Sequence, residues 1–498
     1  MVTPMDAELI ARWQFGITTV YHFLFVPITI GLSMLVAVLQ TIWYKTGNET
    51  FLRLTKFYGK LFLINFAIGV VTGIVQEFQF GMNWSEYSRF VGDVFGAPLA
   101  LEALLAFFLE STFIGLWIFG WDKLPKKIHL MTIYMAAIGT MLSAIFILAA
   151  NSWMQNPVGS TFRNGRAELT DFPALLTNPV FLVTFAHVIS SAYMAAGGLV
   201  AGIAAWHLAK LNRNGDADNS DRDVIAWRWA AKFGAYVLLV ASLVVAVSGD
   251  LQAKVMTEVQ PMKMAAAEAL YDTTDGAGFS IITIGSLDGS EEVFSIRIPK
   301  LLSFMATGDF NGTVQGINDL EAQFADKGFL REDGSQTDLQ KTFAETLKGI
   351  DVDPTPNVPV VYWTFRLMIG IGMLGALAAL WLLWTLRGGN NPRPTKLWNV
   401  AMLSMPFLPI FGISMGWIMA EMGRQPWLGA GVMPTFTGVS PSVSAFEVLL
   451  TTILYTLVYG GLAVIEFGLI IKYTRKGLPE VAPVEVIEDE DAPLSFAY

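Results

Sequence analysis

The sequence predicts an all-α polytopic membrane protein with about nine transmembrane helices. Of its 498 residues, 53% are hydrophobic and only 15% are charged, whereas a soluble domain is about 25% charged. Several apolar runs reach the length of about 20 residues that a helix needs to cross a bilayer. The nine candidate spans lie at roughly 15–43, 57–80, 94–120, 128–152, 179–208, 229–249, 361–386, 397–420 and 443–472.

The distribution of Lys and Arg between the loops predicts the orientation of these spans. Basic residues crowd the odd-numbered loops and the flank after the last span, whereas the short even-numbered loops carry few of them. Because basic short loops stay in the cytoplasm, we expect the N-terminus outside and the C-terminus inside, with residues 251–359 outside. The basic residues behind this prediction are Lys45, Arg53, Lys56, Lys123, Lys126, Lys127, Lys210, Arg213, Arg222, Arg387, Arg393, Lys396, Lys472, Arg475 and Lys476.

The spans and loops divide the chain into four regions. These are a six-helix half at 1–250, an extramembrane loop of mixed structure at 251–359, a three-helix half at 360–476 and an acidic tail at 477–498. Within the loop, residues 254–271 form an amphipathic stretch that Pro261 interrupts, and residues 279–298 alternate in the manner of a β-hairpin. Its turn is expected at Leu287-Asp288-Gly289-Ser290.

Composition also excludes some kinds of site and partner. The sequence contains no cysteine, which rules out disulfides, thiolate metal sites and iron–sulfur clusters held by cysteine. The net charge is −10, with the acids largely in the loops and the tail, so no nucleic-acid partner is expected.

Two acids lie inside the third span, at Glu102 and Glu110. An intramembrane carboxylate is costly and normally faces a bundle interior or a water-filled path. An ideal helix would place the two about 12 Å apart along its axis, with both able to face one interior. They are interpreted either as part of a proton path or as buried acids that hydrogen-bond to neighbouring helices. Glu77 lies near the outer end of the second span.

The four histidines fall into two pairs. His129 and His207 lie at the inner ends of spans beside basic loops, which is typical of interfacial histidines. His22 and His187 each lie about eight residues inside a span that enters from outside, and so at matching depth in the outer half of the membrane. A buried imidazole needs a partner, which is either a structural hydrogen bond or the iron of a haem.

Other candidate ligands share this outer layer. Met368 lies about eight residues inside the seventh span, and Met joins His as an axial haem ligand in some cytochromes, although most Met residues fill cores. Arg366 nearby needs an anion, for which a haem propionate would serve. Glu421 and Arg424 close the eighth span, either as a simple ion pair or as a metal ligand and its neutralising partner.

Seven segments together resemble subunit I of the cytochrome bd-type quinol oxidases. They occur in the family's order from the first span to the eighth, and the count of nine spans agrees. The segments are YHFLFVPIT (21–29), APLALEALLAFFLEST (97–112), NSWMQNPVG (151–159), TFAHVISSAYM (184–194), VQPMKMAAAEA (259–269), VYWTFRLMIG (361–370) and GWIMAEMGRQPW (416–427).

The resemblance implies two haems b and one haem d in this subunit. By position in these motifs, it assigns His187 and Met368 to the iron of the low-spin haem b, Glu421 to the high-spin haem b and His22 to haem d. It further places Arg366 beside the low-spin haem, Trp417 between haems, Arg424 on a propionate, Glu102 beside the oxygen-reducing pair, and Glu110, Ser111 and Ser143 on a proton path that leads to Glu102. Lys263 and Glu268 match residues of quinol oxidation, in a Q-loop of the short type.

The resemblance also implies an activity, partners and a location. The protein should oxidise membrane quinol at the outer face and reduce oxygen to water with protons from the cytoplasm, so that a membrane potential arises without pumping. We expect a second subunit of similar size, small accessory subunits as further candidates, and a bacterial cell membrane as the location.

Three other functions explain fewer of these residues. A haem–copper oxidase needs about six histidine ligands, and the sequence has four. A dihaem electron conduit would use pairs of histidines on facing helices, which are too few here. An ion-coupled transporter would use Glu102 and Glu110 but would leave the outer His and Met residues unexplained, and the sequence shows no internal repeat.

Overall fold

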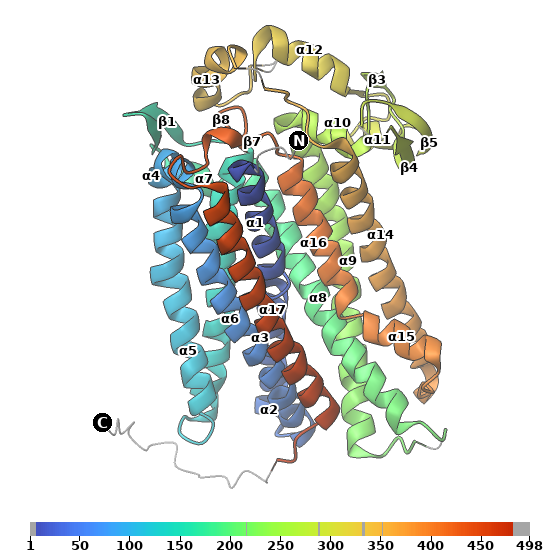
Figure 1. Cartoon of the computed structure of the whole chain (residues 1–498). Helices are drawn as coiled ribbons and strands as arrows, with labels where there is room; N and C mark the ends of the chain where they lie inside the picture. Colours follow the sequence, from blue (N-terminus) through green and yellow to red (C-terminus); the bar gives the residue numbers. More distant parts are fainter. Residues whose placement is uncertain (1–5, 216, 287–288, 331–333, 351, 482–498) are drawn as a thin grey trace, which may run out of the picture.

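The computed structural model describes residues 6–215, 217–286, 289–330, 334–350 and 352–481. Long helices run side by side as a bundle, and the loop between the sixth and seventh spans covers one end of it (Figure 1). Among the described residues, eight helices are long and apolar enough to cross a membrane, and a pair bent by 44° makes a ninth span. The predicted all-α polytopic fold is therefore confirmed.

The spans begin and end as follows. The six-helix half contains α1 and α2 (Ala7–His22, Val26–Thr46), α3 (Glu49–Met82), α4, η1 and α5 (Ser85–Leu101, Glu102–Phe107, Phe108–Phe119), α6 (Lys126–Gln155), α8 (Pro179–Leu211) and α9 (Arg222–Val259). The three-helix half contains α14 (Val358–Thr385), the bent pair α15 and α16 (Lys396–Ser404, Phe407–Met422) and α17 (Ala445–Lys476).

Short elements connect the spans. Between α6 and α8 lie a hairpin and one helical turn, and η2 and the strands after α16 are similarly short. Their bounds are β1 (Ser160–Arg163), β2 (Arg166–Leu169), α7 (Phe172–Leu176), η2 (Arg387–Gly389), β7 (Trp427–Gly429), β8 (Met433–Pro434) and η3 (Thr435–Thr437).

The first span is interrupted where the sequence predicts one continuous helix. α1 ends at His22 and α2 begins at Val26, because Pro27 has no N–H to continue the helical ladder. α1 also begins earlier than expected, at Ala7, where Asp6 caps the helix by accepting from the Glu8 N–H. His22 therefore lies about four turns from the start of its helix, which corrects the expected eight residues.

The third span also departs from a regular helix. Residues Glu102–Phe107 form a π-helical segment, η1, between α4 and α5. Pro98, inside α4, has no N–H to donate and loosens the ladder just before this segment. Because η1 separates Glu102 from Glu110, the angle that an ideal helix gives between them does not apply here.

The loop 251–359 contains the expected break at Pro261 and the expected hairpin. α9 ends at Val259 and α10 begins at Pro261, and β4 pairs antiparallel with β5. Leu287 and Asp288 of the expected turn lie outside the described residues. The elements of the loop are α10 (Pro261–Glu268), β3 (Thr274–Asp275), β4 (Phe279–Gly285), β5 (Glu292–Ile298), α11 (Leu301–Thr307), β6 (Thr313–Val314), α12 (Ile317–Lys327) and α13 (Asp338–Lys348).

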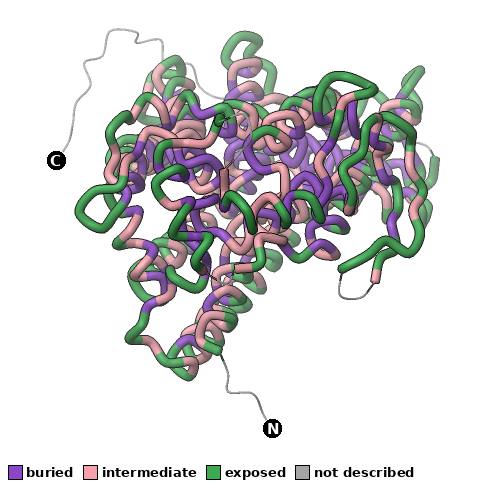
Figure 2. Tube along the Cα trace, turned by 90° about the horizontal axis from the view of Figure 1, so that it is seen from above, coloured by how far each residue is buried: buried purple, intermediate pink, exposed green. Residues whose placement is uncertain are grey.

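The two ends of the bundle differ in what they carry. The start of α1 lies at the end that the loop covers, and α17 finishes at the opposite end (Figure 1). This arrangement agrees with the predicted alternation of loops, and the assignment of the covered end to the outside remains a prediction. Seen from above, buried segments gather in the middle and exposed segments surround them (Figure 2).

Close packing of α8 against α9 forms the centre of the bundle. A Cβ added at Gly197 would lie 2.8 Å from the Gly234 carbonyl oxygen, and one at Gly234 would lie 2.5 Å from the Ala201 nitrogen. Small residues thus allow the two backbones to approach, as is usual between membrane helices. This contact fixes the register of α8 and α9 and brings Ser248 next to His187.

Candidate functional site

The imidazoles of His22 and His187 each bind a hydroxyl on a neighbouring helix. His22 Nδ1 lies 2.8 Å from Thr72 Oγ1 on α3, and His187 Nδ1 lies 3.1 Å from Ser248 Oγ on α9. Thr72 donates its own proton to the carbonyls of Ile68 and Gly69, each at 3.0 Å. Ser248 likewise donates to backbone carbonyls of its own helix.

These hydroxyl protons decide the tautomer of both rings. A hydroxyl that donates to the backbone can only accept from the imidazole, so Nδ1 carries the proton in His22 and His187. The lone pair then lies on Nε2, pointing away from the hydroxyl. A histidine that donates from one ring nitrogen and offers the other is the usual form of a metal-bound histidine. The two rings therefore fit the haem-ligand role expected for them.

Glycines face both rings and the thioether of Met368. A Cβ added at Gly73 would lie 3.3 Å from His22 Cε1, one at Gly249 would lie 3.4 Å from His187 Cε1, and one at Gly416 would lie 2.8 Å from Met368 Sδ. Larger residues at these positions would push the candidate ligands out of place. The absence of a side chain at these glycines thus leaves space for each candidate ligand in the orientation that it has here.

The candidate ligands lie toward the covered end of the bundle. Thr72, which binds His22, lies about 15 Å from the end of α3 at Met82. His187 lies about 12 Å from the start of α8, and Met368 about 15 Å from the start of α14. The bent start of the first span does not move His22 out of this layer, because its partner on α3 fixes its height.

His129 and His207 have structural roles, as their positions suggested. His129 Nε2 lies 2.9 Å from the Trp117 carbonyl oxygen, and its Nδ1 lies 2.9 Å from the Gln40 side-chain amide. His207 Nε2 lies 2.8 Å from the Thr474 carbonyl oxygen, and its ring stacks on Trp227 at 4.2 Å. Both nitrogens of His129 are thus occupied within the protein.

Glu421 and Arg424 form the ion pair that their spacing predicted, within a larger polar cluster. Arg424 donates to Glu421 Oε2, and the Asn151 amide donates to Glu421 Oε1 at 2.9 Å. Arg424 also donates to the backbone carbonyls of Trp427 and Leu428. Its Nε is buried without a partner among the described residues, which leaves one donor for an anion such as a propionate.

Lys263 borders this cluster from the loop side. Its Nζ donates to Gln155 Oε1 at 2.6 Å, and only 5% of the residue is exposed. Burial lowers the pKa of Lys263 from its usual 10.5 to about 7, while Glu421 acts in the opposite direction. Lys263 can therefore gain or lose a proton near neutral pH.

Arg366 pairs with Glu268 of α10. Arg366 NH2 lies 2.7 Å from Glu268 Oε2, and their side chains are only 8% and 1% exposed. Burial raises the pKa of Glu268 above its usual range, against the attraction of Arg366. Nε and NH1 of Arg366 are buried without a partner among the described residues, so the guanidinium can still bind a second anion.

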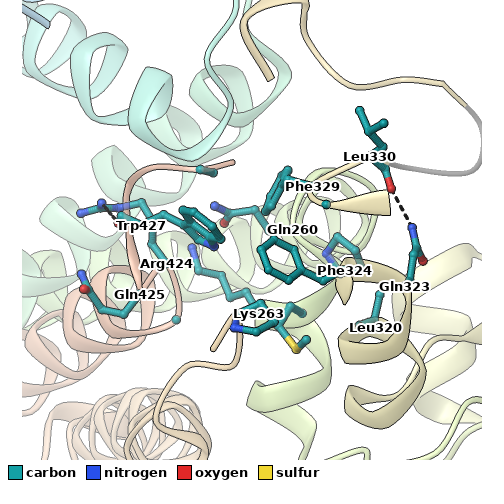
Figure 3. A pocket seen from close by; sticks show the side chains of 16 residues that line it. Gln260, Lys263, Leu320, Gln323, Phe324, Phe329, Leu330, Arg424, Gln425 and Trp427 are labelled. Carbon is teal, nitrogen blue, oxygen red and sulfur yellow. Dashed lines mark hydrogen bonds between the residues drawn. The ribbon is translucent and has the colours of Figure 1, made fainter. Parts of the chain in front are cut away.

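A pocket opens between the loop and the end of α16. It contains about 620 Å³ of space, including the part that is open to solvent. Figure 3 shows Lys263, Arg424 and Trp427 on one side of it and Leu320 and Gln323 of α12 on the other. Mostly apolar walls with a few convergent cations suit a ring that carries polar oxygens.

The acids of the third span lie apart from this pocket. Glu102 accepts from Ser143 Oγ at 2.8 Å, and Glu110 is 7% exposed and packs against Gly139 on α6. Ser143 therefore serves Glu102 and not Glu110. Ser111 makes one long hydrogen bond, at 3.4 Å, to the Phe108 carbonyl oxygen.

Trp417 on α16 packs against the first span. Its ring stacks on Phe23 with the centroids 4.2 Å apart and the planes 11° from parallel. Phe23 follows His22 directly, so the bend after α1 brings an aromatic pair next to the candidate ligand. Trp417 also packs against the small apolar cluster of α6 and α8.

Sequence reasoning missed the residues that orient the candidate ligands. Thr72, Ser248, Asn151 and Gln155 supply the hydrogen bonds described above, and Ser or Thr in an apolar helix gives no local signal of such a role. Glu466 on α17 was also missed. It is 3% exposed, and its Oε2 has no partner within the described part of the chain.

Comparison with known proteins decides between the functions that the geometry allows. The family model for cytochrome bd terminal oxidase subunit I matches residues 10–478. The chain belongs to this family. Cytochrome bd ubiquinol oxidase subunit 1 of Bacillus subtilis (strain 168) is 44% identical over 478 residues, which cover 95% of this chain and 94% of the relative.

Two further comparisons agree. Cytochrome bd-II ubiquinol oxidase subunit 1 of Escherichia coli (strain K12) is 37% identical over 514 residues, with 95% of this chain and 97% of the relative covered. The structure of the bd oxidase from Geobacillus thermodenitrificans is similar at a TM-score of 0.79 and 27% identity, over 95% of this chain and 99% of that one. The chain is a multi-pass protein of the bacterial cell membrane, and the resemblance found in its motifs is confirmed.

Proposed function

We propose that this subunit oxidises quinol in the pocket beneath the loop and passes the electrons to haems held by the outer layer of ligands. As a member of its family, the chain is part of a terminal quinol:oxygen oxidoreductase that uses haem and works with a second subunit. The observation that carries the finer proposal is that Thr72 and Ser248, each on a neighbouring helix, bind Nδ1 of His22 and of His187.

Each candidate ligand has a distinct role in this proposal. His187 and Met368 would hold the low-spin haem b, His22 would hold haem d and Glu421 would hold the high-spin haem b. Haem supplies reversible one-electron transfer and, where a position is open, oxygen binding. The unpartnered nitrogens of Arg366 and Arg424 are placed to bind propionates. Trp417, stacked on Phe23, fills the space between the α1 bend and α16.

The loop residues handle the protons of quinol. Quinol loses protons as it loses electrons, so its site needs groups that accept protons at neutral pH. Lys263 lines the pocket and has a pKa of about 7, while Glu268 lies behind it with a raised pKa. Lys263 accepts a proton in its neutral form, and Glu268 passes protons toward the outside. The loop 251–359 is thus the quinol-binding region, as a Q-loop of the short type.

Protons for oxygen reduction arrive from the other side of the membrane. Glu110 and the next residue, Ser111, receive protons from the cytoplasm, and Ser143 and Glu102 deliver them to the oxygen-reducing pair. Ser143 orients Glu102 by donating to it. Because quinol protons leave outside and these protons enter from inside, turnover builds a membrane potential without pumping.

Spectra of ligand variants in the purified oxidase test this proposal. His187→Ala and Met368→Leu should each remove the low-spin haem b signal from the reduced-minus-oxidised spectrum and leave the haem d band. His22→Ala should remove the haem d band and retain the low-spin haem b. Loss of all bands together in each variant, with the protein still assembled, would argue against separate sites.

The matched control is His207→Gln. His207 is also a buried histidine, but its ring binds a backbone carbonyl and stacks on Trp227. This variant should keep the full haem spectrum. If it lost one haem band selectively, the division into ligand and structural histidines would be wrong.

A further inference from the structure

The β4–β5 hairpin of the outer loop has two faces of opposite character. Its register pairs Ile282 with Ile296 and Ile284 with Phe294 on one face, and Thr283 with Ser295 on the other. Side chains of directly opposed residues share a face of a two-stranded sheet. One face therefore carries these large apolar side chains, and the other carries the polar side chains of Thr283, Ser295 and Arg297.

The polar face is the one that packs against the protein. Ser280 Oγ lies 2.7 Å from the Tyr362 hydroxyl and 2.6 Å from Thr283 Oγ1, and the Ser280 N–H donates to Glu268 at 3.2 Å. Ser280 and Thr283 are 0% and 3% exposed. Arg297 on β5 reaches the Ala269 carbonyl oxygen at 3.3 Å.

The apolar face points away from the protein. Ile284, Phe294 and Ile296 are 54%, 52% and 48% exposed. This is the reverse of the usual sheet, which buries its apolar face and shows its polar face to water. A contiguous apolar surface of this kind indicates contact with a membrane or with another protein.

The position of the hairpin favours the membrane. A Cβ added at Gly289 would lie 2.7 Å from Pro359, so Gly289 packs on the first residues of α14. The hairpin lies beside the upper end of α14, where the helix enters the bundle (Figure 1). The apolar face thus lies beside the first residues of a spanning helix.

Neighbouring helices continue the apolar surface downward. Leu243 and Val247 on α9 are 70% and 65% exposed, and Leu367 on α14 is 45% exposed. Charge at the open end of the hairpin is partly neutralised, because Arg297 pairs with Glu292. Exposed apolar side chains on two spanning helices and on the hairpin suit the same lipid environment.

We propose that the β4–β5 hairpin inserts its apolar face into the boundary between lipid headgroups and acyl chains. The hairpin then anchors the outer loop to the bilayer surface, in the way that amphipathic segments lie in the interface. The occupant of the apolar face is lipid, and the polar face stays on α10 and α14.

Spin labels at single cysteines test this anchor in the complete oxidase. The chain has no cysteine of its own, so Ile284→Cys, Phe294→Cys and Ile296→Cys each introduce one site, with cysteines of other subunits blocked or replaced beforehand. The oxidase is placed in phospholipid nanodiscs. Collision of each label with oxygen, which concentrates in lipid, is compared with collision with a water-soluble nickel chelate.

Two reference sites in the same chain calibrate the result. Leu243→Cys reports the lipid-facing side of α9, and Glu345→Cys reports the exposed side of α13. The labels on the hairpin should show an oxygen-to-nickel collision ratio like that of position 243 and several-fold above that of position 345. A ratio like that of position 345 would show that the face is in water and would overturn the proposal.

A third outcome would also overturn it. Labels that are protected from both reagents would show that another protein covers the face. Each labelled oxidase must first show the unlabelled haem spectrum, so that a misassembled variant is not counted. The hairpin sites are all exposed, and three of them are used so that failure of one variant leaves the test intact.

Discussion

Glu268 and Arg366 form a buried ion pair that links α10 of the loop 251–359 to α14 of the bundle. Their oxygen and nitrogen lie 2.7 Å apart, and the Arg366 guanidinium also lies over the rings of Phe279, Tyr362 and Phe365. The pair thus connects the proposed quinol region to the helix that carries Met368. Electron transfer from quinol to the low-spin haem would cross this junction.

Removing one partner of this pair should loosen the loop. Glu268→Gln leaves the Arg366 charge buried without a counter-charge, and breaking such a pair costs about 3–5 kcal/mol. We expect faster hydrogen exchange in α10 and β4 and a lower thermal transition of the oxidase. Arg222→Gln is the control, because its pair with Glu49 is exposed and worth about 1 kcal/mol or less. Equal effects of the two variants would contradict a structural role for the buried pair.

Lys263 should give quinol oxidation a pH dependence near neutrality. Its pKa of about 7 means that the neutral, proton-accepting form grows as the pH rises through 7. The kcat/KM for quinol should therefore rise through this pH in the unmodified oxidase. Lys263→Met should remove that inflection and lower kcat/KM, and Gln155→Leu, which removes the partner of Nζ, should shift it. An unchanged profile in Lys263→Met would exclude Lys263 as the titrating group.

The same pKa has a consequence for stability. Between about pH 7 and pH 10.5 the folded protein holds Lys263 neutral while the unfolded chain holds it charged, so the unfolded state binds more protons. The contribution of Lys263 to stability therefore rises with pH across this window and is least favourable below pH 7. Thermal transitions of Lys263→Met should lack this part of the pH dependence. The opposite slope would show that Lys263 stays charged in the folded protein.

The sequence predicts the spans and the loop elements well because their signals are local. Apolar length, the Pro261 break and the alternation at 279–298 all lie within a few residues of each other. The bend after His22 and the π-helical segment at Glu102 depend on how Pro27 and Pro98 are accommodated by neighbouring helices. The way that neighbouring helices pack around these prolines leaves no local pattern in the sequence. The sequence therefore predicted continuous helices.

The candidate site also contains residues that the sequence predicts and residues that only the fold brings together. Family motifs and depth predict His187, Met368 and Glu421 as candidate ligands without any structure. The hydrogen-bond partners of the candidate residues have no such local signal. Arg366 binds Glu268, which is 98 residues away in the sequence, and His22 binds Thr72, which is 50 residues away. Only the fold brings such residues together, and the propionate was the one partner of Arg366 that the sequence suggested.

Thr72 and Ser248 should affect the reduction potentials and the retention of the haems without binding them. Thr72→Val and Ser248→Ala remove the acceptors that hold the Nδ1 protons, and loss of such outer partners typically costs about 10–100-fold in affinity or activity. We expect a shifted reduction potential and weaker retention of haem d for Thr72→Val and of the low-spin haem b for Ser248→Ala. Ser242→Ala on α9 is the matched control, since Ser242 donates only to the Leu238 carbonyl oxygen. A shift in the control as large as that of Ser248→Ala would assign the effect to the helix.

Variants of the inner acids should separate the proton path from the rest of the enzyme. Glu110→Gln should slow oxygen reduction and proton uptake from the inner side while leaving the haem spectrum intact, because the amide cannot release a proton at neutral pH. Ser143→Ala should slow oxygen reduction less than Glu110→Gln does, because it disturbs Glu102 only through a lost hydrogen bond. Ser111→Ala should slow oxygen reduction least, because the Ser111 hydroxyl makes only the long hydrogen bond to Phe108. Oxygen consumption and internal pH in proteoliposomes measure this order. Unchanged turnover in Glu110→Gln would remove Glu110 from the path, and a larger effect of Ser111→Ala than of Ser143→Ala would place the route on the other side of α5.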